Sequence, residues 1–182
     1  EFQKLDSFGG YMNKINKNFR ACTEKLLTLE EYKNIFISPE AGLDMIRSDT
    51  LLIIVDANNF NILESSDIAN NISNFVVIDH HRKMVSYIDD AVIFYHEPYA
   101  SSASEMVAEL IQYIGSGGKI TKTEAELLLA GIMLDTKNFI INSGSRTFEA
   151  AAYLRRCVID IIRVKKWFQS DLKSFNTIAG IV

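Results

Sequence analysis

The sequence predicts an α/β domain built on an open parallel β-sheet flanked by helices. Three short apolar runs, rich in branched residues, have the length and composition of buried strands. They cover residues 50–56, 74–79 and 91–96. A polar stretch long enough for a helix separates the first two runs, and amphipathic helical patterns follow the third. Strands separated by helix-length segments are typical of parallel sheets with right-handed crossovers.

Signals for helix starts place further elements around these strands. Ser38 precedes Pro39, which is typical of an N-cap residue followed by the first helical position. Thr28 is a suitable cap for another helix. The predicted helices cover residues 27–36, 38–46, 102–114, 122–134, 147–156 and 163–175. Thr147 is expected to open the fifth of these helices, and residues 138–145 are expected to form a short strand and a turn.

The composition is that of an ordinary globular protein. The 182 residues suffice for one domain with a substantial core, since 48% are hydrophobic and 23% are charged. A net charge of −4 provides no basic groove for long nucleic acid, although an acidic domain can bind a small phosphorylated ligand through metal ions. The two isolated cysteines, Cys22 and Cys157, indicate free thiols in a reducing compartment. No apolar run is long enough to span a bilayer and no signal peptide is visible, so we expect a cytoplasmic location.

Acidic residues and histidines stand where the predicted elements end. Asp56 and Asp79 close the first two apolar runs, His80 and His81 follow at once, and Asp135 ends a predicted helix. Ligands gather at the carboxyl ends of strands in open parallel sheets, so these side chains are expected to converge. Carboxylates and imidazoles together suit Mn²⁺, and also Mg²⁺, Fe or Zn²⁺. Two ions that share a carboxylate can clamp a phosphate ester and activate a water for in-line attack.

Each of these residues also has a simpler interpretation. Asp56 or Asp79 alone can be the cap of a following helix. Adjacent histidines in a turn are often merely solvated, and Asp135 can be a turn residue. The joint arrangement, with each group at the end of an apolar element, is what favours a metal site.

The segment "VIDHHR", residues 77–82, resembles the third motif of the DHH phosphoesterase superfamily, which includes RecJ-type nucleases, oligoribonucleases and family II inorganic pyrophosphatases. Five further blocks resemble the phosphodiesterase domain of the GdpP/YybT group of cyclic-di-AMP phosphodiesterases. They are "FISPEAGLDMI", "LLIIVDANN", "EPYASSASEMVAEL", "LLLAGIMLDTKNF" and "SGSRTFEAAAYLRR". The similarity runs from about Phe36 to Asp171.

The resemblance implies an α/β DHH domain that hydrolyses cyclic di-AMP to a linear dinucleotide with Mn²⁺. By motif, Asp56 would bridge two metal ions, His80 would bind one of them, and Asp135 would complete a metal shell. Asp79 would orient His80 through a hydrogen bond. His81 would face the phosphate or the leaving oxygen.

Arg146 is implied by the same resemblance as a contact for substrate phosphate, because a guanidinium fork matches phosphate oxygens. A structural ion pair is an equal alternative for Arg146. We expect Ser101 and Ser102 to cap the helix that follows them and not to touch the ligand.

The first motif of the family departs from its usual pattern here. Asp6 matches the second aspartate of that motif and is the candidate metal ligand, but Lys4 stands at the position of the first aspartate. An ammonium there would repel a cation. Either one metal site is lost, or the first residues are not a true match. The second motif also differs, since Asn59 and Phe60 stand where a basic residue and a proline are common.

Residues 1–162 are expected to form the catalytic lobe, and residues 163–182 a linker helix toward a DHH-associated domain beyond the chain. The full-length parent is expected to be membrane-anchored and dimeric. Its ligand is expected to be a cyclic or short linear dinucleotide. Two alternatives remain: a degenerate domain that binds a nucleotide or a partner protein without turnover, and an oligoribonuclease or RecJ-like exonuclease acting on short RNA or DNA.

Overall fold

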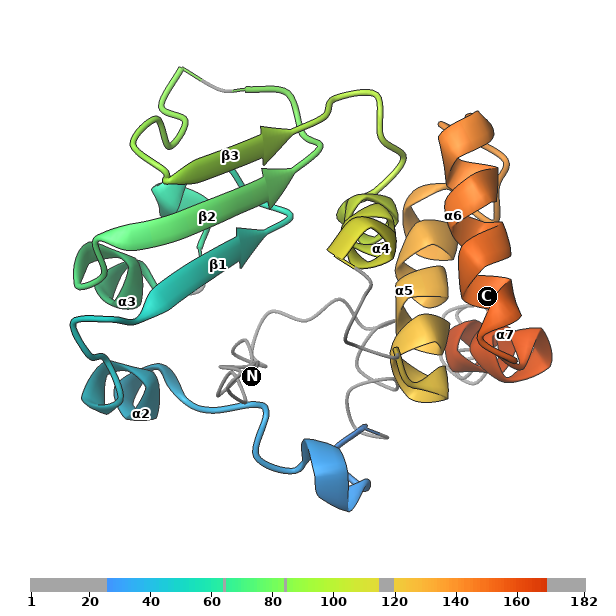
Figure 1. Cartoon of the computed structure of the whole chain (residues 1–182), viewed down its shortest axis with the longest axis horizontal. Coiled ribbons are helices and arrows are strands. Elements are labelled where there is room, and N and C mark those ends of the chain that lie inside the picture. Colours follow the sequence, from blue (N-terminus) through green and yellow to red (C-terminus); the bar gives the residue numbers. More distant parts are fainter. Residues whose placement is uncertain (1–25, 64, 84, 115–119, 170–182) are drawn as a thin grey trace, which may run out of the picture. The chain divides into compact units, whose positions relative to one another are not determined.

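The computed structural model describes residues 26–63, 65–83, 85–114 and 120–169 (Figure 1). The chain divides into two compact units. The larger unit comprises Leu51–Ile62 and Asn74–Lys166, and it holds the sheet and the helices α4, α5 and α6. Leu63–Ser73 and the described residues before Leu51 belong to the other unit. Every predicted site residue that the structure describes lies in the larger unit.

The sheet confirms the predicted fold class. Strands β1 (Leu51–Val55), β2 (Asn74–Asp79) and β3 (Ile93–His96) pair in parallel, in the order β1-β2-β3. Val55 is opposite Ile78, and Asp79 is opposite His96. The carboxyl ends of all three strands therefore lie at one edge of the sheet, as the arrows of Figure 1 show.

The two connections between strands differ. Between β1 and β2 the chain forms a short 3-10 helix, η3 (Phe60–Ile62), and helix α3 (Ser66–Asn70), in agreement with the helix-compatible pattern. Among the described residues between β2 and β3 there is no helix. Backbone hydrogen bonds hold this connection instead: Ile88 N donates to Asn58 O at 2.8 Å, and Val92 N donates to Phe75 O at 2.9 Å.

Three helices pack pairwise against one another in the larger unit. They are α4 (Ala103–Ile114), α5 (Lys122–Asp135) and α6 (Ser145–Arg156). Helix α4 also contacts β2, where Met106 and Ala100 pack on Ile78. Among the described residues no helix is long and apolar enough to cross a membrane.

The helix starts agree only partly with the predicted caps. The Ser38 hydroxyl accepts a hydrogen bond from Ala41 N at 3.2 Å at the start of α2 (Pro39–Asp44), as predicted. Helix α6 begins at Ser145 and not at Thr147. Thr147 lies at its third position, where its hydroxyl accepts a hydrogen bond from Gly144 N at 3.1 Å. The Thr147 side chain therefore caps the helix by binding the backbone N–H of the N-cap residue Gly144.

Two local predictions are wrong. Residues 27–36 contain only the 3-10 helix η2 (Glu30–Tyr32), whose N-cap Leu29 has no side-chain cap hydrogen bond. Residues 138–145 form no strand, because the chain turns directly after α5. There Lys137, Asn138 and Phe139 have φ values of 47°, 59° and 66°. Three successive left-handed residues are unfavourable for side chains with a Cβ and cannot extend into a strand.

Thr136 holds this left-handed turn. Its hydroxyl donates to Ile132 O at 2.6 Å and accepts from Phe139 N at 2.9 Å, and its carbonyl accepts from Ile140 N at 2.9 Å. Thr136 is fully buried. The turn thus ends α5 immediately after Asp135.

Helix α7 (Ile161–Gln169) covers the first part of the predicted linker helix, and the rest of that prediction lies outside the described residues. Asp160 caps it, because its Oδ1 accepts hydrogen bonds from Ile162 N and Arg163 N. The buried Glu126 of α5 accepts from Asp160 N at 3.0 Å and lies 2.5 Å from Nη2 of Arg163. These contacts attach the start of α7 to α5.

Candidate metal centre

Asp56 follows β1 directly and has a left-handed backbone, with φ 64°. Its N–H still continues the sheet by donating to Ile78 O at 2.9 Å. Aspartate tolerates this conformation better than most residues with a side chain, although the conformation still costs backbone energy. Its carboxylate oxygen Oδ1 lies 3.4 Å from Nε2 of His80 and 3.8 Å from Nδ1 of His81.

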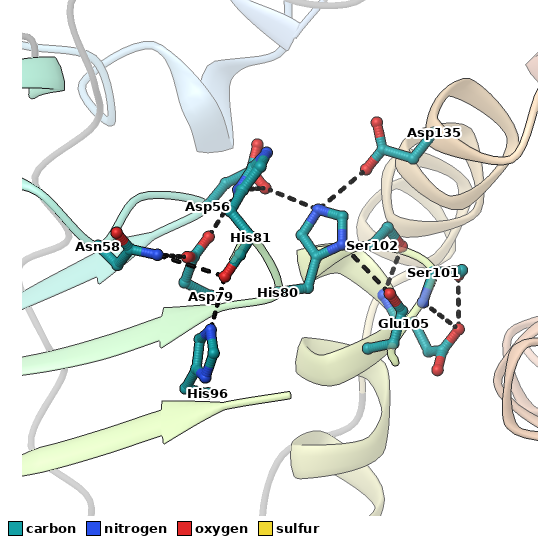
Figure 2. Close-up of polar contacts among 11 residues, drawn as sticks. Asp56, Asn58, Asp79, His80, His81, His96, Ser101, Ser102, Glu105 and Asp135 are labelled. Carbon is teal, nitrogen blue, oxygen red and sulfur yellow. Dashed lines mark hydrogen bonds and ion pairs between the residues drawn. The ribbon is translucent and has the colours of Figure 1, made fainter. Parts of the chain in front are cut away.

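His80 lies between two carboxylates and a backbone carbonyl (Figure 2). Its Nδ1 is 3.2 Å from Ala100 O, while its Nε2 faces Oδ1 of Asp56 and lies 3.9 Å from Oδ2 of Asp135. A carbonyl oxygen can only accept, so this hydrogen bond requires the proton on Nδ1. In the neutral ring, Nε2 then presents its lone pair toward the two carboxylates.

The electrostatics of the cluster favour a cation. The hydrogen bond with Asp56 raises the pKa of His80 above its ordinary value, against the effect of burial. Burial raises the pKa of Asp135, and the nearby charge of Asp56 raises it further, while His80 and His81 lower it. Two carboxylates that share a partly buried site repel each other, and a proton or a metal ion relieves that repulsion.

Asp79 contacts His81, whereas the sequence-based prediction paired it with His80. The fully buried carboxylate of Asp79 places Oδ1 2.8 Å from Nδ1 of His81, and its Oδ2 accepts from Nδ2 of Asn58 at 2.5 Å. His80 instead engages the Ala100 carbonyl through its Nδ1. Both imidazole rings approach Oδ1 of Asp56, and their centroids lie 4.6 Å apart.

Asn58 and His96 belong to this network but were not singled out from the sequence. The His81 carbonyl accepts from Nε2 of His96 at 2.6 Å, and Nδ2 of Asn58 lies 3.4 Å from it. A signal was available, because His96 ends the third apolar run just as Asp79 ends the second. The strand register places them opposite each other.

Arg146 forms the ion pair that was the alternative to its phosphate contact. Its Nε and Nη2 bind the two carboxylate oxygens of Glu109 at 2.9 and 2.7 Å, and its Nη1 lies 3.3 Å from Glu97. The hydrogen bond to Glu109 raises the pKa of Arg146 above its ordinary value. The guanidinium fork is thus directed at protein carboxylates.

The serines before α4 also take the predicted structural position. Ser102 caps the helix, since its hydroxyl accepts from Glu105 N at 3.0 Å. The Ser101 hydroxyl donates to Glu105 Oε2 at 2.5 Å. Asp6 and Lys4 lie outside the described residues, so the geometry bears on neither.

The donor set suits a divalent ion. Within the described ranges, Asp56, His80 and His81 offer ligand atoms that all lie within 4.8 Å of one another. Asp135 adds a carboxylate oxygen 3.9 Å from Nε2 of His80. Oxygen and imidazole donors together match Mn²⁺ and neighbouring divalent ions. A carboxylate-histidine cluster at the carboxyl ends of parallel strands is typical of a metal-dependent hydrolase site.

Comparison with known proteins identifies the family. The model of the DHH family, N-terminal domain, matches residues 7–132, so the chain belongs to the DHH family. The chain is 40% identical over 170 residues to "Cyclic-di-AMP phosphodiesterase GdpP" of Bacillus subtilis (strain 168), covering 93% of this chain and 26% of that protein. It is 37% identical over 157 residues to "Cyclic-di-AMP phosphodiesterase PdeA" of Listeria monocytogenes, covering 85% and 24%.

More distant relatives also match the chain. The chain is 31% identical over 147 residues to "Probable manganese-dependent inorganic pyrophosphatase" of Thermotoga maritima, covering 71% and 26%. The crystal structure of an exopolyphosphatase-related protein from Bacteroides fragilis matches with a TM-score of 0.66 at 25% identity, covering 79% of this chain and 43% of that one. The chain spans about a quarter of the length of these curated relatives. The comparisons confirm the resemblance and the fold class that the sequence predicted.

Proposed function

We propose that this chain carries the metal centre of a phosphodiesterase that hydrolyses cyclic di-AMP to a linear dinucleotide, with Mn²⁺ as the metal. The observation that carries the proposal is that Nε2 of His80 lies 3.4 Å from Oδ1 of Asp56 and 3.9 Å from Oδ2 of Asp135, with His81 beside them, where β1 and β2 end. Membership of the DHH family and similarity to two proteins named cyclic-di-AMP phosphodiesterases support the reaction and substrate. The name of the pyrophosphatase relative supports manganese.

In this proposal Asp56, Nε2 of His80 and Asp135 would hold the metal. The family resemblance implies that Asp56 would be shared by two ions and that Asp6, outside the described residues, would be a further ligand. A divalent ion held there supplies charge neutralisation for the phosphate ester and activation of a water molecule. Nε2 of His80 faces both carboxylates, which suits a ligand whose other nitrogen is already engaged by a carbonyl.

His81 and Asp79 act as a proton-handling pair. The buried Asp79 holds the proton at Nδ1 of His81, 2.8 Å away. The His81 side chain is 56% exposed, so Nε2 is accessible to the phosphate or the leaving oxygen. In the imidazolium form, Nε2–H can donate its proton to that oxygen as the ester bond breaks. Asp79 would stabilise that form through its hydrogen bond with Nδ1.

Arg146 contributes to this centre indirectly in our proposal, through its ion pairs with Glu97 and Glu109. Glu97 N donates to Asp79 O at 3.1 Å, so the ion pairs support the segment that follows β3. Direct contact with substrate phosphate would be left to the guanidinium N–H groups that these carboxylates do not engage.

By the same family resemblance, we propose that the full-length protein is a membrane-anchored dimer with this domain in the cytoplasm. The test of the reaction uses the full-length product of the gene that encodes the chain. With Mn²⁺ and cyclic di-AMP we expect linear dinucleotide to form, and we expect Asp135→Ala to abolish it. Asp90→Asn is the control, because Asp90 is an exposed carboxylate on the connection between β2 and β3.

Any of three results would contradict the proposal. Activity that survives Asp135→Ala would remove Asp135 from the metal centre. Tight binding of cyclic di-AMP without linear product, at saturating Mn²⁺, would favour a binding domain without turnover. Faster cleavage of short linear dinucleotides than of the cyclic one would favour the oligoribonuclease alternative.

A further inference from the structure

We propose that Ser101 and Glu105 are positioning residues that fix the ring of His80. They hold the peptide group between Ala100 and Ser101 so that the Ala100 carbonyl engages Nδ1 of His80 and leaves Nε2 for the metal. This inference rests on the proposed function, in which Nε2 of His80 is a metal ligand. It concerns residues on the opposite side of His80 from the carboxylates (Figure 2).

One peptide group connects the two sets of contacts. The Ala100 carbonyl oxygen lies 3.2 Å from Nδ1 of His80, and the N–H of the same peptide group, which belongs to Ser101, donates to Glu105 Oε2 at 3.2 Å. The peptide group is planar, so its carbonyl and N–H point in opposite directions. An acceptor that holds the N–H therefore sets the direction of the carbonyl.

The Ser101 side chain reinforces this arrangement. Its hydroxyl donates to the same Glu105 oxygen at 2.5 Å. Ser101 and Glu105 are 2% and 1% exposed. Water therefore competes little for these hydrogen bonds, which makes them stronger and more directional than surface ones.

The position of Glu105 differs from that of an ordinary helix cap. In a capping box, the acidic residue at the third helical position accepts from the N–H of the N-cap residue. Ser102 occupies the N-cap position and its hydroxyl accepts from Glu105 N at 3.0 Å, but the Glu105 carboxylate reaches one residue further back, to Ser101. A buried carboxylate is costly unless it is well hydrogen-bonded. We therefore expect the contact between Glu105 and Ser101 to do more than cap the helix.

The hydrogen bonds form a chain from Glu105 through the peptide group to His80. Chains of this kind polarise their members, so the Glu105 carboxylate strengthens the Ala100 carbonyl as an acceptor. A stronger acceptor holds the proton on Nδ1 and increases the electron density at Nε2, which makes Nε2 a better metal ligand. Glu105 thus acts on the metal centre without touching it.

Three variants separate the parts of this chain. Glu105→Ala removes the acceptor, and Glu105→Gln keeps an acceptor oxygen but removes the charge. Ser101→Ala removes the hydroxyl and keeps the backbone N–H. Thr121→Ala is the matched control, because it removes the cap hydrogen bond from Glu124 N to the Thr121 hydroxyl at the start of α5.

Two measurements are made on each folded variant. Nitrogen-15 NMR of the imidazole rings reports which ring nitrogen carries the proton. It is recorded on metal-free protein at a pH where the His80 ring is neutral. Calorimetric titration with Mn²⁺ gives the dissociation constant. In the wild type we expect the His80 proton on Nδ1. In Glu105→Ala we expect a mixture of tautomers and an affinity lower by about 10- to 100-fold.

Glu105→Gln and Ser101→Ala should show smaller losses of affinity, and Thr121→Ala should change neither readout. Unchanged nitrogen shifts and unchanged affinity in Glu105→Ala would overturn the inference. If that variant does not fold, unchanged values in both milder variants would overturn it. Absence of Mn²⁺ binding by the wild type would contradict the proposed function instead, and the metal-free tautomer comparison would still test the positioning role.

Discussion

The carboxylate of Asp79 joins His81 to Asn58: one oxygen lies 2.8 Å from Nδ1 of His81, and the other accepts from the Asn58 amide at 2.5 Å. Asn58 also lies 3.4 Å from the His81 carbonyl, which Nε2 of His96 contacts at 2.6 Å. The ring and the backbone of His81 are thus held from two neighbouring strand ends. Such partners set the tautomer and the orientation of a catalytic imidazole.

Asp79→Asn tests the role of this carboxylate. The amide keeps the shape but loses the charge that stabilises an imidazolium at His81. In the full-length protein we expect kcat to fall by about 100-fold or more with little change in KM, as is usual when the orienting carboxylate of a histidine is lost. Steady-state kinetics with cyclic di-AMP measure the effect. A fall in Mn²⁺ affinity with unchanged kcat at saturating metal would place Asp79 with the metal ligands.

Arg146→Met separates the two interpretations of Arg146. Loss of charged hydrogen bonds to Glu109 is expected to lower the free energy of unfolding by about 1–2 kcal/mol at neutral pH. Urea unfolding measures this change. If Arg146 serves only its ion pairs, KM for cyclic di-AMP stays within about twofold. A rise in KM beyond tenfold, without loss of stability, would favour the phosphate contact.

The same ion pair predicts a pH dependence of stability. The hydrogen bond from Arg146 lowers the pKa of Glu109 below its ordinary value of 4.5, although burial opposes this shift. A depressed pKa in the folded state stabilises the fold above the unfolded-state pKa, and that contribution is lost as the pH falls through the folded-state pKa. Unfolding free energies measured below pH 4.5 should therefore converge for wild type and Arg146→Met. A constant difference down to the lowest accessible pH would contradict this account.

Thr136→Val tests the left-handed turn that follows Asp135. Valine preserves the shape but leaves the half-buried Phe139 N–H without its acceptor, so we expect a loss of about 1–3 kcal/mol in the free energy of unfolding. We also expect weaker Mn²⁺ binding, because the turn sets the backbone beside Asp135. Thr123→Val on the same helix is the control. Equal effects of both substitutions would show that the turn has no special part in the site.

Much of the fold follows from local pattern. The three apolar runs predicted the three parallel strands, and the rule that ligands collect at strand ends placed Asp56, Asp79, His80 and His81 at one edge. The partner of Asp79 was not predictable in the same way. It depends on the path of the backbone after β2 ends at Asp79 and on Ala100, which lies 20 residues from His80. Sequence spacing does not report such a contact.

The remaining differences also have physical causes. The predicted strand over residues 138–145 failed because the Thr136 hydroxyl and carbonyl capture the following N–H groups into a left-handed turn. Over residues 27–36 only the 3-10 helix η2 forms, and its N-cap Leu29 has no side-chain cap hydrogen bond to stabilise a longer helix. Asn58 was overlooked because its amide is uncharged, whereas the site was predicted from carboxylates and histidines at the strand ends.

The central claim is that the strand-end cluster binds a divalent ion. The most direct test is calorimetric titration of the chain with Mn²⁺, with metal analysis as a check on stoichiometry. The account predicts at least one ion per chain, lost in Asp56→Asn and retained in Asp90→Asn. A wild-type chain that binds no Mn²⁺, or an Asp56→Asn variant that binds it as tightly as the wild type, would contradict the account.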